Sequence, residues 1–290
     1  MLRYIFILGL AVAAHTYSAQ APETELSSPP FKLTATAELV LLDVSVKDAA
    51  GEHIANLGKD NFRIYEGGKL QKITHFANDD VPVTVGLVID TSGSMRPKHK
   101  DVVTAALSFI SASNRRDEVF VVNFGDHVSS GLPFDVPFTA DIRQLRAALW
   151  MGTPDGRTAL YDAILFSLRH IEKGKCEKKA LLLVSDGGDN SSSHASDEVM
   201  RMVRGSLATI YTVGIFDDDD PDRNPGLLRR LARMSGGEAY FPAQLSEVIG
   251  ICHQIARDIR TRYTIGYVPV RSGEQGSLRK IKVTASAGGG

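Results

Sequence analysis

Cysteine is scarce in this chain, and neither sign of charge dominates it. Its 290 residues include two cysteines, too few for a disulfide-rich scaffold or for a zinc site built from cysteine alone. The 33 Lys and Arg residues nearly balance the 34 Asp and Glu residues, for a formal net charge of −1. Nucleic acids and anionic membranes attract strongly basic proteins, so we expect no nucleic-acid partner. The content of 43% hydrophobic and 23% charged residues excludes wholesale disorder and indicates a globular core.

Long apolar runs are also missing. The longest, Ile5–Ala14, would measure about 15 Å as a helix, half of a hydrocarbon core of about 30 Å. It follows Arg3 and precedes small and polar residues up to Ala19, which is the three-part pattern of a secretory signal peptide. We therefore expect residues 1–19 to be a signal peptide cleaved after Ala19. The mature protein should be secreted or periplasmic, with no stable membrane span after signal cleavage.

Export leaves two interpretations of the cysteines. In an oxidising compartment, Cys176 and Cys252 could pair. The bond would close a loop of about 76 residues and stabilise the fold by on the order of 4 kcal/mol. The alternative is two buried thiols that never meet. The sequence does not decide between them, because it does not supply the Cα separation that a disulfide demands.

The remaining chain has alternating patterns at both ends and a different pattern between them. Residues 20–31 are polar and rich in proline, as in a linker. In 32–81 and 261–290, apolar and polar residues alternate as in half-buried strands; the alternating segments contain Leu42, Val44 and Val46, Phe62 and Ile64, Leu70–Phe76, Tyr263–Val268, and Ile281, Val283 and Ala285. Gly67-Gly68 permits the tight reversal of a hairpin. We expect both end segments to form one small β domain, with residues 82–260 inserted in it.

The inserted region alternates buried strands with helices. Its nearly continuous apolar runs are typical of strands covered on both faces; they are Val83–Ile89, Val119–Phe124, Ala180–Ser185 and Thr209–Ile215. Between and after them, apolar residues recur at helical spacing, as in 158–172 and 245–255. This order predicts an α/β fold: a doubly wound, mainly parallel sheet with helices on both faces. We expect Trp150 and Phe166 to lie in its core.

Acidic and hydroxyl side chains gather where these strands end. Asp90 closes the first apolar run, and Ser92 and Ser94 follow it on the turn into the next helix. Asp186 ends the third run in the same way, and Thr158 stands at the start of the helix that leads to it. The carboxyl ends of parallel strands meet at one edge, where ligands bind. Carboxylate and hydroxyl oxygens suit a hard divalent cation such as Mg²⁺, Mn²⁺ or Ca²⁺.

The set Asp90-x-Ser92-x-Ser94, Thr158 and Asp186 resembles the metal-ion-dependent adhesion site of von Willebrand factor type A domains. The resemblance covers roughly residues 82–260. It implies that these five residues hold Mg²⁺ (or Mn²⁺ or Ca²⁺), directly or through water. It also implies that the coordination shell is left open for an Asp or Glu of a protein or peptide partner. The flanking β segments and Gly214–Asp220 are similar to bacterial secreted proteins with a von Willebrand factor A-related domain, which implies no defined activity.

A binding protein, and not an enzyme, is therefore the expected function, with two alternatives. In the first, the metal stabilises the fold and another face binds the partner. In the second, the site is a metal-dependent hydrolase, for which Asp186 or Asp189 are the candidate general bases. No G-x-S-x-G elbow, phosphate-binding loop or H-E-x-x-H pair occurs in the sequence. The acidic run 217–222 is interpreted as a solvated loop that could also tune the field around the metal.

Overall fold

The computed structural model describes residues 39–286, except 50, 52, 79, 217–220 and 270–278. The expected signal peptide, the linker 20–31 and most of the acidic run therefore lie outside the described residues. The chain divides into two compact units. One consists of His53–Ala55 and Asn78–Arg262, and the other takes its residues from Met1–Glu52, Asn56–Ala77 and Tyr263–Gly290. Among the described residues, none of the helices combines the length and apolar character needed to cross a bilayer.

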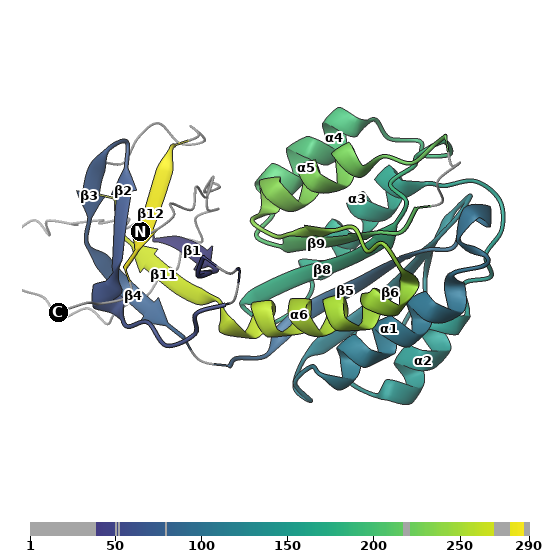
Figure 1. Ribbon diagram of the computed structural model, residues 1–290, viewed down its shortest axis with the longest axis horizontal. Helices are drawn as coiled ribbons and strands as arrows, with labels where there is room; N and C mark the ends of the chain where they lie inside the picture. Colours follow the sequence, from purple (N-terminus) through teal and green to yellow (C-terminus); the bar gives the residue numbers. More distant parts are fainter. Residues whose placement is uncertain are drawn as a thin grey trace, which may run out of the picture. The chain divides into compact units, whose positions relative to one another are not determined.

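The larger unit is built on a six-stranded sheet (Figure 1). The order across the sheet is β10-β9-β8-β5-β6-β7. The strands are β5 (Val83–Asp90), β6 (Glu118–Phe124), β7 (Val128–Ser130), β8 (Lys178–Ser185), β9 (Thr209–Gly214) and β10 (Ala239–Tyr240). All neighbours are parallel except β7, which is antiparallel to β6. The mainly parallel sheet expected from the sequence is confirmed.

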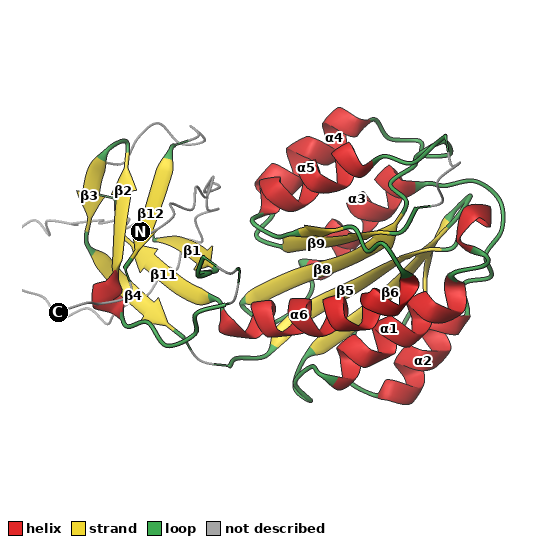
Figure 2. Ribbon diagram, viewed as in Figure 1, coloured by secondary structure: helices red, strands yellow, loops and turns green. Residues whose placement is uncertain are grey.

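Helices cover both faces of this sheet (Figure 2). One layer contains α1 (His99–Ser111), α2 (Ile142–Trp150) and α6 (Val248–Thr261), where α1 packs on both others. The opposite layer contains α3 (Leu160–Ile171), α4 (Ser196–Gly205) and α5 (Pro225–Ser235), packed in that order. Short 3-10 turns occupy Gly93–Met95 and Leu245–Glu247. The fold is thus a doubly wound α/β sandwich of three layers.

The winding of the chain determines where loops meet. From the central strand β5, the chain passes to β6 on one side and then to β8 on the other. The direction in which strands are added to the sheet reverses beside β5. The loop after β5 therefore leads to a helix on one face of the sheet and the loop after β8 to a helix on the other, and the two loops diverge at the carboxyl edge, where ligands bind in such folds. Close packing at this centre requires Gly86, because a Cβ there would lie 2.4 Å from Phe120 Cζ and 2.5 Å from Leu181 Cδ2.

The smaller unit consists of two antiparallel three-stranded sheets. The first has the order β1-β11-β4, and the second β12-β2-β3. The strands are β1 (Val40–Val44), β2 (Phe62–Glu66), β3 (Lys69–Gln71), β4 (Ile73–Ala77), β11 (Tyr263–Tyr267) and β12 (Ile281–Ala285), with a 3-10 turn at Lys59–Asn61. Gly67 and Gly68 have φ of 54° and 81°, as the hairpin requires. The run Leu70–Phe76 is not one returning strand: it divides between β3 and β4, which belong to different sheets.

Two expected core residues lie at the surface instead. Trp150 is 48% exposed and Phe166 37% exposed. Both belong to the outer faces of their helices, because the buried residues of α2 are Leu145, Ala148 and Leu149, and Phe166 lies between the buried positions of α3. Both side chains are hydrophobic and were therefore expected in the core. The orientation of each helix places them on the outer face instead.

The structure has both cysteines as free thiols. Cys176 is half-buried and Cys252 is buried in α6. Burial raises the pKa of the Cys252 thiol to about 12, and that of Cys176 is also raised, chiefly by burial. Of the two interpretations left open by the sequence, the structure has the one without a disulfide.

Candidate metal centre

Asp90 ends β5 and is completely buried. Its Oδ1 accepts a hydrogen bond from the backbone N–H of Ser92 at 2.8 Å. Its Oδ2 accepts one from Ser185 Oγ, at the end of the neighbouring strand β8, at 2.6 Å. Each carboxylate oxygen therefore has a donor, and the two bonds tie the carboxylate to both strand ends. The bond from Ser185 fixes the side chain to the neighbouring strand, and the bond from Ser92 fixes it to the loop that follows β5.

A chain of hydrogen-bonded oxygens leads from the first loop to Asp186. The hydroxyls of Ser92 and Ser94 lie 3.1 Å apart. Ser94 Oγ donates to Asp186 Oδ2 at 2.7 Å, and Asp186 Oδ1 accepts from the N–H of Gly188 at 2.9 Å. Ser92 and Asp186 are each 2% exposed. The structure thus brings together four of the five residues selected from the sequence: Asp90, Ser92, Ser94 and Asp186.

Thr158 is placed by its backbone. Its N–H donates to Asn190 Oδ1 at 2.8 Å, and its carbonyl accepts from the N–H groups of Asn190 and Ser191, both at 3.0 Å. The same loop binds the first one through Gly93 N–H and Gly156 C=O at 3.1 Å. Thr158 therefore lies on a loop attached to both others. Within the described residues, however, no hydrogen bond links its hydroxyl to either acid.

Burial and a second acid shift the titration of Asp90. Burial, followed by the negative charge of Asp186, raises the pKa of Asp90 from 3.8 to about 7. The hydrogen bonds from Ser185 and Ser92 act in the opposite direction and do not compensate. Two carboxyl groups close together in a buried place disfavour a second negative charge unless a positive charge accompanies them.

Sequence reasoning missed two residues that position this site. Ser185 donates to Asp90, and its Oγ also accepts the N–H of Gly187 at 2.9 Å. Asn190 holds the Thr158 loop through its amide oxygen. A signal for Ser185 was present, because a polar residue at the end of a fully apolar strand faces the same edge as the acid that follows it. Asn190 had no such signal, because its contact joins residues 32 positions apart.

Glycine is required where the loops turn most tightly. Gly156, before Thr158, has φ of 71°, and a Cβ there would lie 2.1 Å from Asp126 Oδ2. Gly187, after Asp186, has φ of 84°, and its Cβ would lie 2.6 Å from Asn224 O. The positive φ disfavours a side chain at both positions, and at Gly187 the backbone of Asn224 leaves no space for one. The glycines therefore determine how the second and third loops approach the site.

Asp189, a further acid of this edge, is engaged by hydrogen bonds. Asp189 Oδ1 accepts from Tyr161 N–H at 3.1 Å and from the Ser192 hydroxyl. Further along the loop, His194 Nδ1 lies 2.7 Å from Oδ1 of Asp162, which belongs to α3. These contacts attach the loop after β8 to the start of α3.

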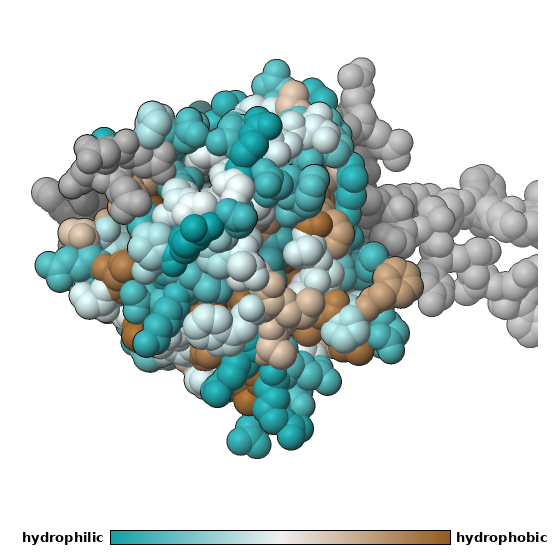
Figure 3. All heavy atoms as spheres, turned by 90° about the vertical axis from the view of Figure 1, so that its right-hand side faces the viewer, coloured by the Kyte–Doolittle hydropathy of each residue, from teal (hydrophilic) through white to brown (hydrophobic). Residues whose placement is uncertain are grey.

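The donor set of the site consists of oxygen only: two carboxylates and three hydroxyls. This composition fits a hard divalent cation and does not fit zinc or copper, which favour nitrogen and sulfur. Among the described residues, no group of three or more His, Cys, Asp or Glu side chains could hold a metal ion, so a site at this edge depends on its hydroxyls. Figure 3 looks at the side of the molecule toward which β5 and β8 run, and its surface is mainly hydrophilic or neutral with scattered hydrophobic residues.

The fold is a doubly wound α/β domain whose sheet ends in an acidic, hydroxyl-rich edge. Residues 85–188 match the family model of the von Willebrand factor type A domain. The match lies within the region in which the sequence motif indicated a resemblance to such domains. Among curated proteins, none matches the chain.

Solved structures with this fold come from several bacteria. A von Willebrand factor type A protein from Catenulispora acidiphila is 15% identical with a TM-score of 0.55, over 89% of this chain and 72% of its own. The vWF domain of the type V pili tip protein Mfa5 from Porphyromonas gingivalis is 13% identical with a TM-score of 0.51, over 62% and 95%. An aerotolerance-related membrane protein from Bacteroides fragilis is 15% identical with a TM-score of 0.50, over 61% and 98%. At these identities the likeness concerns the fold.

Proposed function

We propose that this protein is an exported protein-binding module that engages an acidic residue of its partner through a divalent cation. The observation that carries the proposal is the hydrogen-bonded set of oxygens from Asp90, Ser92, Ser94 and Asp186 at the carboxyl edge of β5 and β8. The match to the type A domain supports it. So do the pilus-tip and membrane proteins in which similarly folded domains occur. Export rests on the signal-peptide pattern of residues 1–19.

Asp90, Ser92, Ser94, Thr158 and Asp186 would hold the cation, which we take to be Mg²⁺, with Mn²⁺ or Ca²⁺ as alternatives. When bound, the cation supplies positive charge and a coordination position for a carboxylate. Asp90 and Asp186 contribute negative charge, and the hydroxyls contribute neutral oxygens. The five side chains would leave a coordination position of the cation open, and a carboxylate from an Asp or Glu of the partner would fill it by displacing water.

A binding role fits these residues better than hydrolysis. A hydrolase needs a general base positioned to accept a proton from a metal-bound water, whereas the two candidate bases are tied into the loops by hydrogen bonds. Both oxygens of Asp186 already accept hydrogen bonds, from Ser94 and Gly188. Asp189 Oδ1 accepts two. We therefore place the protein among binding proteins and not among enzymes.

A pull-down from the native secretome tests this function. Immobilised full-length protein should retain a partner in Mg²⁺ and release it in chelator. Asp90→Asn should retain none in either condition, while Asp135→Asn, which removes the same charge from an exposed site, should behave as wild type. If the same partner is retained equally with and without chelator, the metal has at most a structural role and another face binds. A phosphoester or peptide substrate turned over with Mg²⁺ or Mn²⁺ would instead establish the hydrolase.

A further inference from the structure

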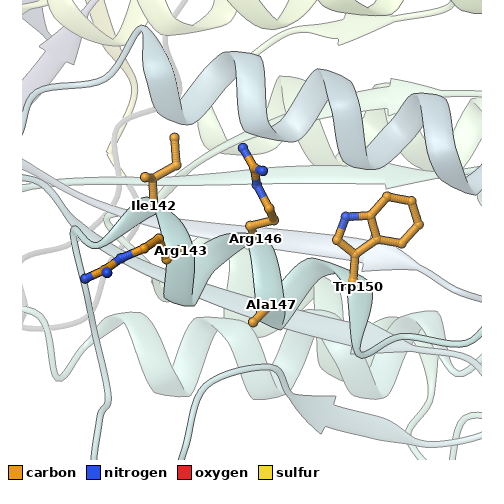
Figure 4. Close-up of a pocket in the computed structure, with 5 residues that line it drawn as sticks. All are labelled: Ile142, Arg143, Arg146, Ala147 and Trp150. Carbon is orange, nitrogen blue, oxygen red and sulfur yellow. The ribbon is translucent and has the colours of Figure 1, made fainter.

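The outer face of α2 exposes large apolar side chains. Ile142 is 40% exposed and Trp150 is 48% exposed, and Met151, the residue after the helix, is 67% exposed. Ile142, Arg146 and Trp150 are four residues apart, so they form one stripe along the helix. Figure 4 shows these three side chains rising from the same side of α2. A surface pocket of about 400 Å³ is lined, among the described residues, by these three together with Arg143 and Ala147. We call these five residues the α2 face.

Positive charge lies between the apolar ends of this face. The guanidinium of Arg146 has no hydrogen bond or ion pair with any of the described residues, and the residue is exposed. Arg143 differs, because its guanidinium pairs with Asp141 at 3.1 Å. The α2 face itself contains two arginines and no acid. Its centre therefore carries an unbalanced positive charge between two apolar side chains.

The apolar end at Trp150 packs against the residue beneath it. Its indole packs edge-on against the ring of His99, with centroids 5.5 Å apart and an angle of 80°. His99 is buried at the start of α1, and burial lowers the pKa of its ring. The helix is fixed from below by Leu145, Ala148 and Leu149, which are buried. A preformed surface of this kind loses little conformational entropy when it binds.

We propose that the α2 face is a second docking surface, which binds an extended acidic segment of a partner protein. The stripe from Ile142 to Trp150 covers eight helical rises, or about 12 Å. An extended segment advances about 3.3 Å a residue, and alternate side chains share a face. A segment of the form apolar-x-acidic-x-apolar therefore places its carboxylate over Arg146 and its apolar side chains over Ile142 and Trp150. This surface acts independently of the metal site.

The charge of the face disfavours other occupants. A second copy of the chain on a two-fold axis would bring the same patch against itself, so that Arg146 would face positive charge without an acid. An anionic membrane attracts clusters of four or more basic residues. The α2 face has two arginines, and one of them is already paired with Asp141. An acidic peptide satisfies the one unpaired guanidinium and covers both apolar ends.

The only tryptophan of the chain lies in this face, so intrinsic fluorescence reports on it directly. The probe is an acetylated and amidated peptide with Leu-Ser-Glu-Ser-Leu in a Gly/Ser frame, titrated into the full-length protein in chelator. Binding should shift the emission of Trp150 to the blue, saturably, because leucine replaces water around the indole. Arg146→Glu should weaken the affinity about tenfold or more, because like charges then meet. Arg169→Glu, an exposed arginine of α3 in the opposite layer, should leave the affinity unchanged.

Two control peptides separate the contributions. Gln in place of Glu should weaken binding about tenfold through loss of the charge-assisted bond, and Leu-Glu-Ser-Ser-Leu, with the acid on the opposite face, should bind as weakly. The proposal is overturned if the Glu peptide gives no saturable shift, or if Arg146→Glu binds it as wild type does. It is also overturned if vesicles containing phosphatidylglycerol shift the emission and the peptide does not. A second copy of the chain would be the occupant, and the proposal overturned, if the emission shifts with protein concentration and sedimentation shows a dimer.

Discussion

Replacing Asp90 by Asn should separate the two consequences of its burial, the cost of an unaccompanied charge and the ability to hold a metal. The substitution keeps the shape of the side chain and removes one negative charge. In chelator at pH 8, the raised pKa of about 7, against 3.8 in the unfolded chain, means that the wild-type carboxylate is destabilising. A shift of about three units corresponds to about 4 kcal/mol. The Asn variant avoids this cost but loses about 1–2 kcal/mol from the hydrogen bonds of Ser92 and Ser185.

The balance favours the variant in chelator by about 2 kcal/mol. For a protein of this size, that is a rise of roughly 4–8 °C in melting temperature. Mg²⁺ or Mn²⁺ at 100 times its dissociation constant should stabilise the wild type by about 2.7 kcal/mol. The corresponding rise is roughly 5–10 °C. Asp90→Asn should not respond to either ion and should keep its circular dichroism spectrum. Ser92→Ala, Ser94→Ala and Thr158→Ala should lose affinity less severely, because each removes a neutral oxygen.

Calorimetry with and without metal measures these shifts, and Asp135→Asn is the control for a change of charge at an exposed site. A wild-type protein that responds to metal in neither calorimetry nor direct titration refutes the assignment of the five ligands. The pH dependence is a further check. A folded pKa above the unfolded one means that the folded state holds the proton more tightly between pH 4 and 7. Stability in chelator should therefore fall as pH rises through that range, and less steeply in Asp90→Asn.

Three further predictions follow from single contacts or strands. Ser185→Ala should destabilise the protein by about 1–3 kcal/mol in urea unfolding at pH 8, because Asp90 loses a hydrogen-bond donor. Ser167 is also fully buried but donates to a helix carbonyl, so Ser167→Ala should destabilise the protein less. Equal losses of stability in the two variants would contradict this reasoning. Mass spectrometry of the non-reduced protein should find two thiols, with Cys176 alkylated before Cys252; a mass lower by about two units would show a disulfide instead. Deleting residues 263–290 removes the central strand of one sheet and an edge strand of the other, so the truncated protein should aggregate. A soluble product with an unchanged melting temperature would disprove the dependence of the β unit on its C-terminal strands.

Local patterns in the sequence predicted most of the larger unit. The four apolar runs became β5, β6, β8 and β9 with ends displaced by at most two residues, because a strand buried on both faces needs an uninterrupted apolar segment. The position of Asp90, Ser92, Ser94 and Asp186 at one edge also followed, since parallel strands end together. Their role as ligands stays a prediction. Thr158 was placed on the correct loop, but its link to the site passes through Asn190, which no local pattern indicates.

What the sequence determined by itself was therefore the class of each element and the residues at the ends of the buried strands, because periodicity of two or of 3.6 is a local property. Only the tertiary structure decided which surfaces are covered. It divided Leu70–Phe76 between two sheets, left both thiols unpaired and turned Trp150 outward beside Arg146. It also placed Ser185 against Asp90 across two neighbouring strands. Each of these depends on contacts between residues distant in sequence, and burial follows from the packing of whole elements more than from the hydrophobicity of one side chain.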